Sequence, residues 1–262
     1  MRALHTAATG MMAQEINVQV ISNNIANMRT TGYKRQRAEF QDLLYEHVRR
    51  VGTQTSNQGN ILPAGIELGA GVKTVGTPRV MTQGSLLPTS KELDVAIRGD
   101  GLFRILLPDG RTAYTRDGSF EMDAQGRLVT AQGYVVQPGI TIPQNARNIT
   151  INAQGQVSAI VGTETTPTQL GQIELANFVN KAGLQAIGDN LFMETPASGS
   201  PQNGTPNIDG FGDLQQGNLE QANVEAVKEI SDLIAAQRAY EMNAKVITAS
   251  GEMLSATSNL MR

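Results

Sequence analysis

Cysteine and tryptophan are both absent from the 262 residues, and aromatic residues make up only 4%. Without cysteine the chain has no disulfide framework, no thiol nucleophile and no thiolate ligand for a metal. The net charge of −3 gives no field that would attract nucleic acid, and the basic cluster Lys34, Arg35 and Arg37 is too small to change this. We therefore expect neither thiol chemistry nor a nucleic-acid partner.

Long apolar runs are also missing. No stretch reaches the roughly 18 apolar residues of a membrane span, and residues 1–6 lack the apolar segment of a cleavable secretory signal. Hydrophobic residues still make up 40% of the chain, which is enough for a folded core. We expect a folded protein without membrane insertion, whose export, if it occurs, needs no cleavable signal.

The sequence does contain a heptad pattern near its N-terminus, in residues 4–28. Apolar residues recur there every seven positions in two rows, broken once by Gln14, and polar residues lie between the rows. One row is Leu4, Met11, Val18 and Ile25, and the other is Ala7, Ile21 and Met28. A narrow apolar stripe of this kind is typical of a coiled-coil seam, so we expect a helix that needs a partner.

A matching pattern lies at the C-terminus, in residues 224–261. Its main row is Leu233, Tyr240, Ile247, Leu254 and Met261, and a flanking, mostly small row is Ile230, Gln237, Ala244, Gly251 and Ser258. We expect the two terminal helices to pack on each other or on other copies of the chain. The alternative is a pair of ordinary amphipathic helices in a compact bundle, but the sequence between them predicts no further strong helix.

The assembly interface expected from these patterns consists of residues from both helices. They are Leu4, Met11, Val18, Ile21, Ile25, Ile230, Leu233, Tyr240, Ile247 and Leu254.

The segment after the first helix is harder to interpret. Thr30, Thr31 and Gly32 are helix-ending residues. Residues 36–50 fit a short helix through the spacing of their apolar side chains, whereas residues 52–71 are rich in Gly, Thr, Asn and Gln. The latter are expected to form a loop or a loosely specified hairpin, and its length of about 20 residues favours an interaction arm.

Residues 72–217 are expected to form a β domain. Turn dipeptides such as Asp109-Gly110 and Gln132-Gly133 recur every seven or eight residues, which predicts an up-and-down meander. Residues 195–217, rich in Pro, Gly, Asn and Ser, are predicted to be a linker. The expected strands are 103–107, 112–115, 119–122, 127–130, 134–136, 149–151, 156–161 and 172–177.

The predicted fold class is therefore α+β, with coiled-coil-like terminal helices forming an axial core and a central all-β domain inserted between them. Four segments are expected. They are 1–35 (N-terminal axial helix), 36–71 (linker with the extended arm), 72–217 (β domain) and 218–262 (C-terminal axial helix).

The sequence holds no constellation typical of catalysis. Asp109 and Asp117 precede glycine, where turn geometry explains an aspartate without any chemistry. Gly99-Asp100-Gly101 lacks the third glycine of a dinucleotide fingerprint. His5 and His47 are isolated, so neither a nucleophilic triad nor a zinc site can be assembled locally. We expect no catalytic residue, no cofactor and no metal.

Four long stretches carry a family resemblance. They are SNNIANMRTTGYKR (22–35), LDVAIRGDGLF (93–103), YTRDGSFEMDAQGRLVTAQGYVV (114–136) and NVEAVKEISDLIAAQRAYEMNAKVI (223–247). Together they resemble the flagellar basal-body rod and hook proteins, and the distal rod members of that family most closely. The resemblance extends over nearly the whole chain. Only Met28 and Arg29 depart from it, at positions where the family usually has Val or Ser.

The resemblance implies a structural subunit that polymerises helically into the straight flagellar drive shaft, with the terminal helices at the centre and the β domain outside. It implies several partners: other copies, proximal rod proteins and hook protein at the two ends, the peptidoglycan- and outer-membrane-ring proteins, and the type III export apparatus. The distal rod has an insertion after the first block, where residues 52–71 stand. The resemblance also implies a location in the basal body, from the periplasm to the outer membrane.

Three alternatives remain open from the sequence. A hook or proximal rod subunit belongs to the same class. A cell-wall-acting enzyme on a helical stalk would show clustered carboxylates in a cleft. A monomeric binding module would have folded termini in dilute solution.

Overall fold

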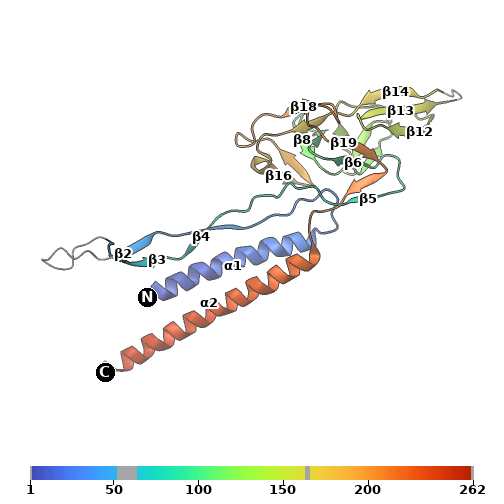
Figure 1. Cartoon of the computed structure of the whole chain (residues 1–262). Helices are drawn as coiled ribbons and strands as arrows, with labels where there is room; N and C mark the ends of the chain where they lie inside the picture. Colours follow the sequence, from blue (N-terminus) through green and yellow to red (C-terminus); the bar gives the residue numbers. More distant parts are fainter. Residues whose placement is uncertain (1, 52–63, 163–165, 261–262) are drawn as a thin grey trace. The chain divides into compact units, whose positions relative to one another are not determined.

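The computed structural model describes residues 2–51, 64–162 and 166–260, which fold into two compact units (Figure 1). The helical unit contains residues 1–25, 36–78 and 225–262, and the β unit contains residues 26–35 and 79–224. The two terminal helices pack together, and the sequence between them is rich in strands. The α+β class predicted from the sequence is confirmed, whereas the four-segment division stays a prediction.

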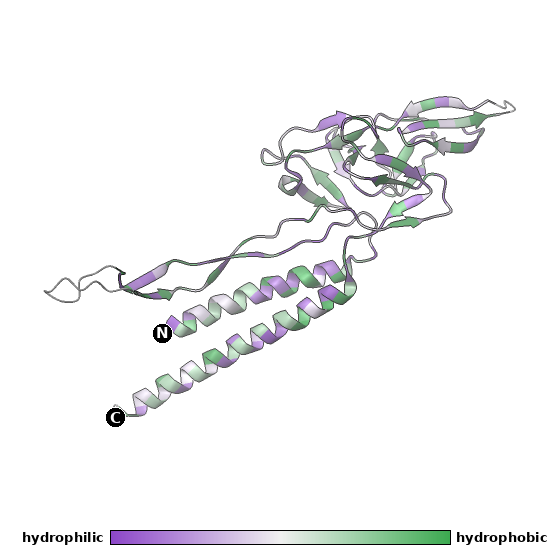
Figure 2. Cartoon of the chain, viewed as in Figure 1, coloured by the Kyte–Doolittle hydropathy of each residue, from purple (hydrophilic) through white to green (hydrophobic). Residues whose placement is uncertain are grey.

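The helical unit is built on α1 (Arg2–Ala26) and α2 (Ala226–Leu260). The two helices lie side by side and run antiparallel (Figure 1), and both carry polar and apolar residues on many sides (Figure 2). Helix α1 ends two residues earlier than the periodicity predicted, because the chain turns at Asn27, whose carbonyl accepts a hydrogen bond from the Thr30 amide at 3.0 Å.

Residues 36–50 are extended, so the short helix predicted there is wrong. They form β1 (Glu39–Asp42) and β2 (Tyr45–Arg49), which pair antiparallel with β4 (Val72–Gly76) and β3 (Ile66–Gly69). The pairing partners lie about 20 or more residues further along the chain, and local periodicity cannot register such long-range pairing. Residues 66–69 of the predicted arm are thus a strand, and residues 52–63 lie outside the described residues.

The β unit contains one large sheet and several smaller ones. Its elements are β5 (Leu86–Pro88), β6 (Val95–Arg98), β7 (Leu102–Leu106), β8 (Thr112–Thr115), β9 (Phe120–Met122), β10 (Leu128–Thr130), β11 (Val135–Val136), β12 (Ala146–Ile151), β13 (Gln156–Val161), β14 (Thr168–Gln172), β15 (Leu175–Asn177), the 3₁₀ turn η1 (Lys181–Gly183), β16 (Gln185–Gly188), β17 (Leu191–Met193), β18 (Gln202–Gly204), β19 (Asp213–Gln216) and β20 (Asn218–Glu220).

The large sheet has the order β16-β17-β8-β7-β11-β10-β9, and β15 pairs with both β7 and β18. The predicted hairpins β7–β8, β9–β10 and β10–β11 are confirmed, but the simple meander is wrong because β8 does not pair with β9. The Asp117-Gly118 dipeptide between them is not a hairpin turn. Instead the Gly118 carbonyl accepts a hydrogen bond from the Val95 amide at 3.0 Å, which draws the chain toward β6.

The predicted linker 195–217 is also partly wrong. It contains β18, which pairs with β15, and β19, which pairs with β6 and places Leu214 opposite Ile97. Leu214 is buried, and Arg98 binds Asp213 with two hydrogen bonds of 2.9 and 2.8 Å. One buried side chain and one ion pair therefore order a segment whose composition indicated a loop. Similarly, the single strand predicted over 172–177 is divided between β14 and β15.

The β unit has its own hydrophobic core. Phe103 and Phe120 meet edge to face with ring centroids 4.9 Å apart, and both are fully buried. Aromatic and branched side chains from β6, β7, β13 and β15 complete this cluster. Such burial is the main favourable contribution to folding, so the β unit is expected to be stable by itself.

Three charged side chains are buried together in the β unit. The Glu220 side chain is fully buried and binds Lys34 at 2.6 Å and also Arg116. Glu220 also accepts a hydrogen bond from the Gly84 amide at 2.8 Å. Arg116 in turn donates to the carbonyls of Ile97, Gly99 and Gly101. Every buried charge thus has several partners, which is the condition under which buried ions are tolerated.

The cluster shifts the pKa of both titratable members. Burial alone would raise the pKa of Glu220, but the charges and hydrogen bonds of Arg116 and Lys34 outweigh it and lower that pKa below its usual range. Burial also lowers the pKa of Lys34, against the opposing effect of Glu220. Because an arginine stays protonated, Glu220 always faces at least one cation.

Replacing Glu220 by Gln is expected to lower the free energy of unfolding of the β unit by about 3–5 kcal/mol at neutral pH, since Lys34 and Arg116 are then buried without a counter-charge. The effect depends on pH. Because the folded-state pKa of Glu220 is lowered, its contribution is complete above the unfolded value of about 4.3 and is lost as the pH falls through the folded value.

Urea unfolding across pH 2–8 measures this difference between the wild type and E220Q. The matched control is Glu121→Gln, because Glu121 is largely exposed and its pair with Lys91 is long, at 3.7 Å. E121Q should change the free energy by less than about 1 kcal/mol. An E220Q protein as stable as E121Q at pH 7 would contradict the role given to the buried cluster.

Candidate assembly surface

The two helices meet in a regular antiparallel register. The Asn24 side chain on α1 donates a hydrogen bond of 3.1 Å to Glu229 on α2, and a Cβ placed on Gly10 would lie 3.0 Å from the Asn243 amide. These contacts are two heptads apart on both helices, so α1 and α2 keep the same register over at least four turns. Gly10 lets the helices approach closely, and Asn24 and Glu229 are buried at the seam.

The residues buried at the seam are mostly small or polar. On α2 the buried residues Glu229, Ala236 and Ser250 are spaced by seven and then fourteen residues, and on α1 the buried residues are Ala7, Ala13, Val20, Ile21 and Asn24. The predicted heptad rows contained Ala7 and Ile21 but missed the others, because the N-terminal rows followed apolar side chains at a fixed spacing. The signal that could have revealed this seam is the heptad spacing of Ala236, Asn243 and Ser250.

The predicted interface residues are placed differently. Ile21 is buried, and six residues are half-buried: Leu4, Met11, Val18, Ile25, Leu233 and Ile247. Ile230, Tyr240 and Leu254 are exposed. With about 100° per residue, the row that begins at Leu4 lies about 100° around α1 from the Gly10–Asn24 row that faces α2. The structure therefore brings Ile21 into the α1–α2 seam and leaves much of the predicted set partly accessible.

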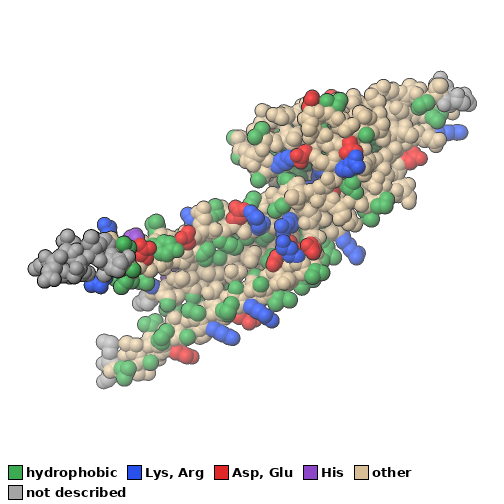
Figure 3. Space-filling model, in the orientation of Figure 1, with side chains coloured by type: hydrophobic (Ala, Val, Ile, Leu, Met, Phe, Trp, Pro, Cys, Tyr) green, Lys and Arg blue, Asp and Glu red, His purple; other side chains and the backbone are tan. Residues whose placement is uncertain are grey.

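Helix α2 exposes large apolar side chains along its length, and Figure 3 shows those on one face. Val227, Ile230 and Ile234 form one stripe, which lies opposite the seam row at about 100° per residue. Met242, Val246 and Met253 form a second stripe, about 90° from the seam row. Exposed fractions reach 78% for Val227 and 63% for Met253. Contiguous exposed apolar surface of this extent marks a protein–protein interaction site.

The C-terminal end of α2 extends beyond α1. Helix α2 has 35 residues and α1 has 25, and in the observed register Arg2 lies level with residue 251. Residues 251–260 are all exposed, including Leu254 and Leu260. This end of α2 therefore lacks a cover from the described part of its own chain.

The β2–β3 ribbon is a second exposed apolar feature. Every residue of β2 and β3 is exposed, and no third strand pairs with them among the described residues. Leu44, Val48 and Leu68 contribute large apolar surface, with Leu44 89% exposed. An isolated two-stranded ribbon is only marginally stable in water and offers open edges, so its surface is suited to contact with a partner.

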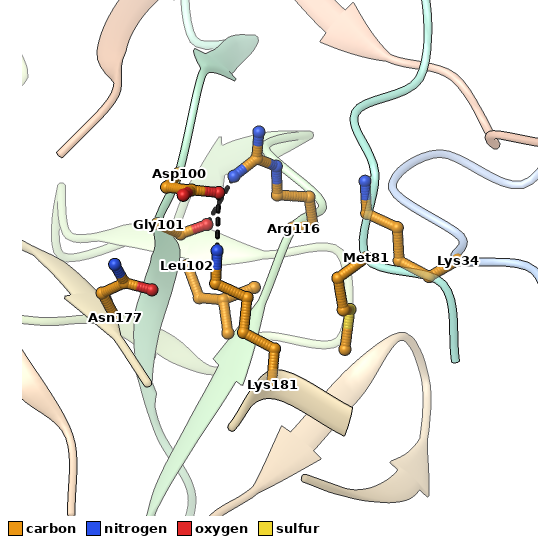
Figure 4. A pocket seen from close by; sticks show the side chains of 8 residues that line it. All are labelled: Lys34, Met81, Asp100, Gly101, Leu102, Arg116, Asn177 and Lys181. Atoms are coloured by element: carbon orange, nitrogen blue, oxygen red, sulfur yellow. Dashed lines mark hydrogen bonds and ion pairs between the residues drawn. The ribbon is translucent and has the colours of Figure 1, made fainter. Parts of the chain in front are cut away.

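A small hollow lies beside the buried charge cluster of the β unit. Its volume is about 20 Å³, which is room for one water molecule. Figure 4 shows its lining, where Lys181 reaches toward Asp100 and Arg116 toward Gly101. Lys181 binds Asp100 at 2.6 Å, which occupies both charges with each other.

Three of the aspartates considered for chemistry, and His47, have structural partners. Asp109, Asp117 and Asp123 each accept hydrogen bonds from backbone amides two residues further along, which confirms the turn interpretation. His47 lies 3.0 Å from Glu67 on the exposed ribbon. Among residues 2–51, 64–162 and 166–260 there is no group of three His, Cys, Asp or Glu side chains that could hold a metal, and no helix that could span a membrane.

Three family models match separate parts of the chain. Residues 4–34 match "Flagella basal body rod protein", residues 96–159 match "Flagellar hook protein FlgE/F/G D1 domain", and residues 215–260 match "Flagellar basal body rod FlgEFG protein C-terminal". The first and last cover most of α1 and α2, so the matched regions include the helices that carry the exposed apolar stripes.

Curated relatives match over the whole length. The flagellar basal-body rod protein FlgG of Caulobacter vibrioides is 56% identical over 260 residues, covering 99% of both chains. FlgG of Agrobacterium fabrum is 53% identical and that of Bacillus subtilis 38% identical, each with full coverage of both chains. The chain therefore belongs to the FlgG family of flagellar basal-body rod proteins, which are structural subunits of the distal rod and not enzymes.

Proposed function

We propose that this distal rod subunit polymerises helically with copies of itself, with α1 and α2 at the centre of the polymer and the β unit outside. The observation that carries the proposal is the apolar surface on several sides of α2. Apolar side chains on more than one side of a helix are normally buried, whereas the only fully buried residues among those described on α2 are Glu229, Ala236 and Ser250.

The ten residues predicted from the heptads are part of the proposed interface. Ile230, Tyr240 and Leu254 are exposed in the protomer and available to neighbours. The half-buried row Leu4, Met11, Val18 and Ile25 adds a stripe on α1. The polymer then supplies the cover that the α1–α2 pair lacks.

The remaining partners rest on family membership and resemblance. We propose proximal rod proteins and hook protein at the two ends of the polymer, and the peptidoglycan- and outer-membrane-ring proteins around it. In this arrangement the rod transmits torque from the periplasm through the outer membrane. The subunit reaches its position through the type III export apparatus, without a cleavable signal.

The β2–β3 ribbon, together with residues 52–63, is proposed to bridge neighbouring subunits and stiffen the polymer. Bending requires subunits to slide past one another as they pass from the inside to the outside of the bend. An exposed ribbon with apolar side chains such as Leu44 and Val48 can dock on a neighbour and oppose that sliding. A straight shaft requires this resistance.

Replacing Ile234 or Ile247 by Asp is expected to abolish polymerisation, because a charge buried without a partner costs several kcal/mol. Ile234 is exposed in the protomer, so I234D should leave the melting of the monomer unchanged. The matched control is Val179→Asp, which places the same charge at an 85% exposed position of the β unit. Electron microscopy of concentrated protein should show tubes for V179D and none for I234D and I247D. Tubes of I234D at the wild-type concentration would exclude this face of α2 from assembly.

Deleting residues 53–64 tests the proposed stiffening. The deletion removes residues between β2 and β3 and none of α1, α2 or the β unit, so assembly should continue. The resulting tubes should be curved or bendable in electron micrographs, because neighbouring subunits can then slide. Tubes as straight as those of the full chain would refute the role of the ribbon.

A further inference from the structure

Three segments of the β unit lie next to the places where the chain passes to the helical unit. The chain passes between the two units at four places, 25–26, 35–36, 78–79 and 224–225. Within the β unit, the segments next to the last three of these places are hydrogen-bonded to one another. The Val80 amide donates to the Arg35 carbonyl at 2.9 Å, and the Gln221 amide donates to the Ser85 carbonyl at 2.9 Å.

Asn223 belongs to the segment that ends at residue 224, and its side chain forms hydrogen bonds with the other two segments. Its Oδ1 accepts a hydrogen bond from the Arg35 amide at 2.8 Å. Its Nδ2 donates to the Val80 carbonyl at 2.7 Å and to the carbonyl and hydroxyl of Thr82, both at 3.0 Å. An amide is the only uncharged side-chain group that accepts on one atom and donates twice on another, which is what this position uses.

The hydrogen bonds of Asn223 hold each segment close to its exit, which is the place where the chain leaves the β unit. Arg35 is the last residue of its segment in the β unit, Val80 is the second of its own, and Asn223 is the last but one. The buried Glu220 acts on the same segments further inside, because it contacts Lys34 and the Gly84 amide. A single strand that leaves a folded unit can swivel, whereas three strands bonded to one another cannot move separately.

We propose that Asn223 is a positioning residue that clasps the three exit segments, so that load arriving through any one of them is shared by all three before it reaches the sheet. The hydrogen-bond geometry of the clasp does not depend on assembly. Its value to a rotating shaft rests on the proposed function, because only a loaded subunit needs such sharing.

The first test is hydrogen exchange on the purified full chain with two variants. In Asn223→Ala the Arg35 and Val80 amides should both exchange roughly tenfold faster, since the clasp is lost. In Asn223→Asp the Arg35 amide should stay protected, because the acceptor oxygen remains. The Val80 amide should exchange faster, because its bond to the Arg35 carbonyl depends on a segment that the Nδ2 group holds through the Val80 and Thr82 carbonyls, and that group is gone. Amides of the central strand β7 should be unaffected in both.

The matched control is Asn180→Ala, which removes a side-chain hydrogen bond to the Ala197 carbonyl away from the exits. It should leave the Arg35 and Val80 amides as in the wild type. Unchanged Arg35 exchange in N223A, or equal changes of the two amides in N223A and N223D, would overturn the proposal, since a side chain that merely fills space does not distinguish acceptor from donor.

The second test applies load to a single monomer held by its two ends. Once α1 and α2 have separated, force enters the β unit at residues 26 and 224, where the chain passes to the helical unit. Asn223, beside the second of these points, is bonded to the 26–35 segment through the Arg35 amide. The lifetime of the folded β unit at constant force should be about tenfold shorter in N223A than in the wild type and N180A. Equal lifetimes would refute load sharing. Because monomers are used, the result does not depend on whether the chain polymerises.

Discussion

The apolar surface around α2 is the constraint on which the rest of the structure depends. A helix of 35 residues presents side chains in every direction, and α1 with its 25 residues covers one of them. The seam between the two is built from small and polar residues such as Ala236, Asn24 and Glu229, so it contributes register and close approach more than apolar burial. The larger side chains, among them Val227, Ile234 and Met253, stay exposed in the protomer. Under the proposed assembly, neighbouring copies of the chain bury them.

The β unit satisfies the opposite requirement. Its aromatic pair Phe103 and Phe120 lies in a core of its own, and the cluster of Lys34, Arg116 and Glu220 is closed by backbone partners. All of these contacts are made within one chain. Under the proposed assembly, one molecule combines a β unit that has its own core with a helical unit whose apolar surface is covered by neighbours. This division suits a subunit that stays separate before assembly and becomes rigid afterwards.

The accuracy of the sequence predictions depended on the range of the interactions involved. Heptads and turn dipeptides are local, and they correctly indicated both helices and most strands from β7 to β13. Elements that depend on distant partners were missed: β1 and β2, which pair with residues 66–76, and β19, which Leu214 anchors opposite Ile97. The seam was only partly predicted for a different reason. Residues such as Gly10, Asn24 and Ser250 act through small size or a hydrogen bond, which an apolar pattern cannot register.

The central claim is that the helices of one chain need other chains to be covered. Hydrogen exchange of α1 and α2 tests it most directly, measured on a verified monomer and on the polymer of the same protein. In the monomer we predict weak amide protection, weakest in residues 251–260, because helices whose apolar faces meet water are only marginally stable. In the polymer we predict strong protection along both helices. Strong protection throughout both helices in the monomer, unchanged on assembly, would contradict the claim.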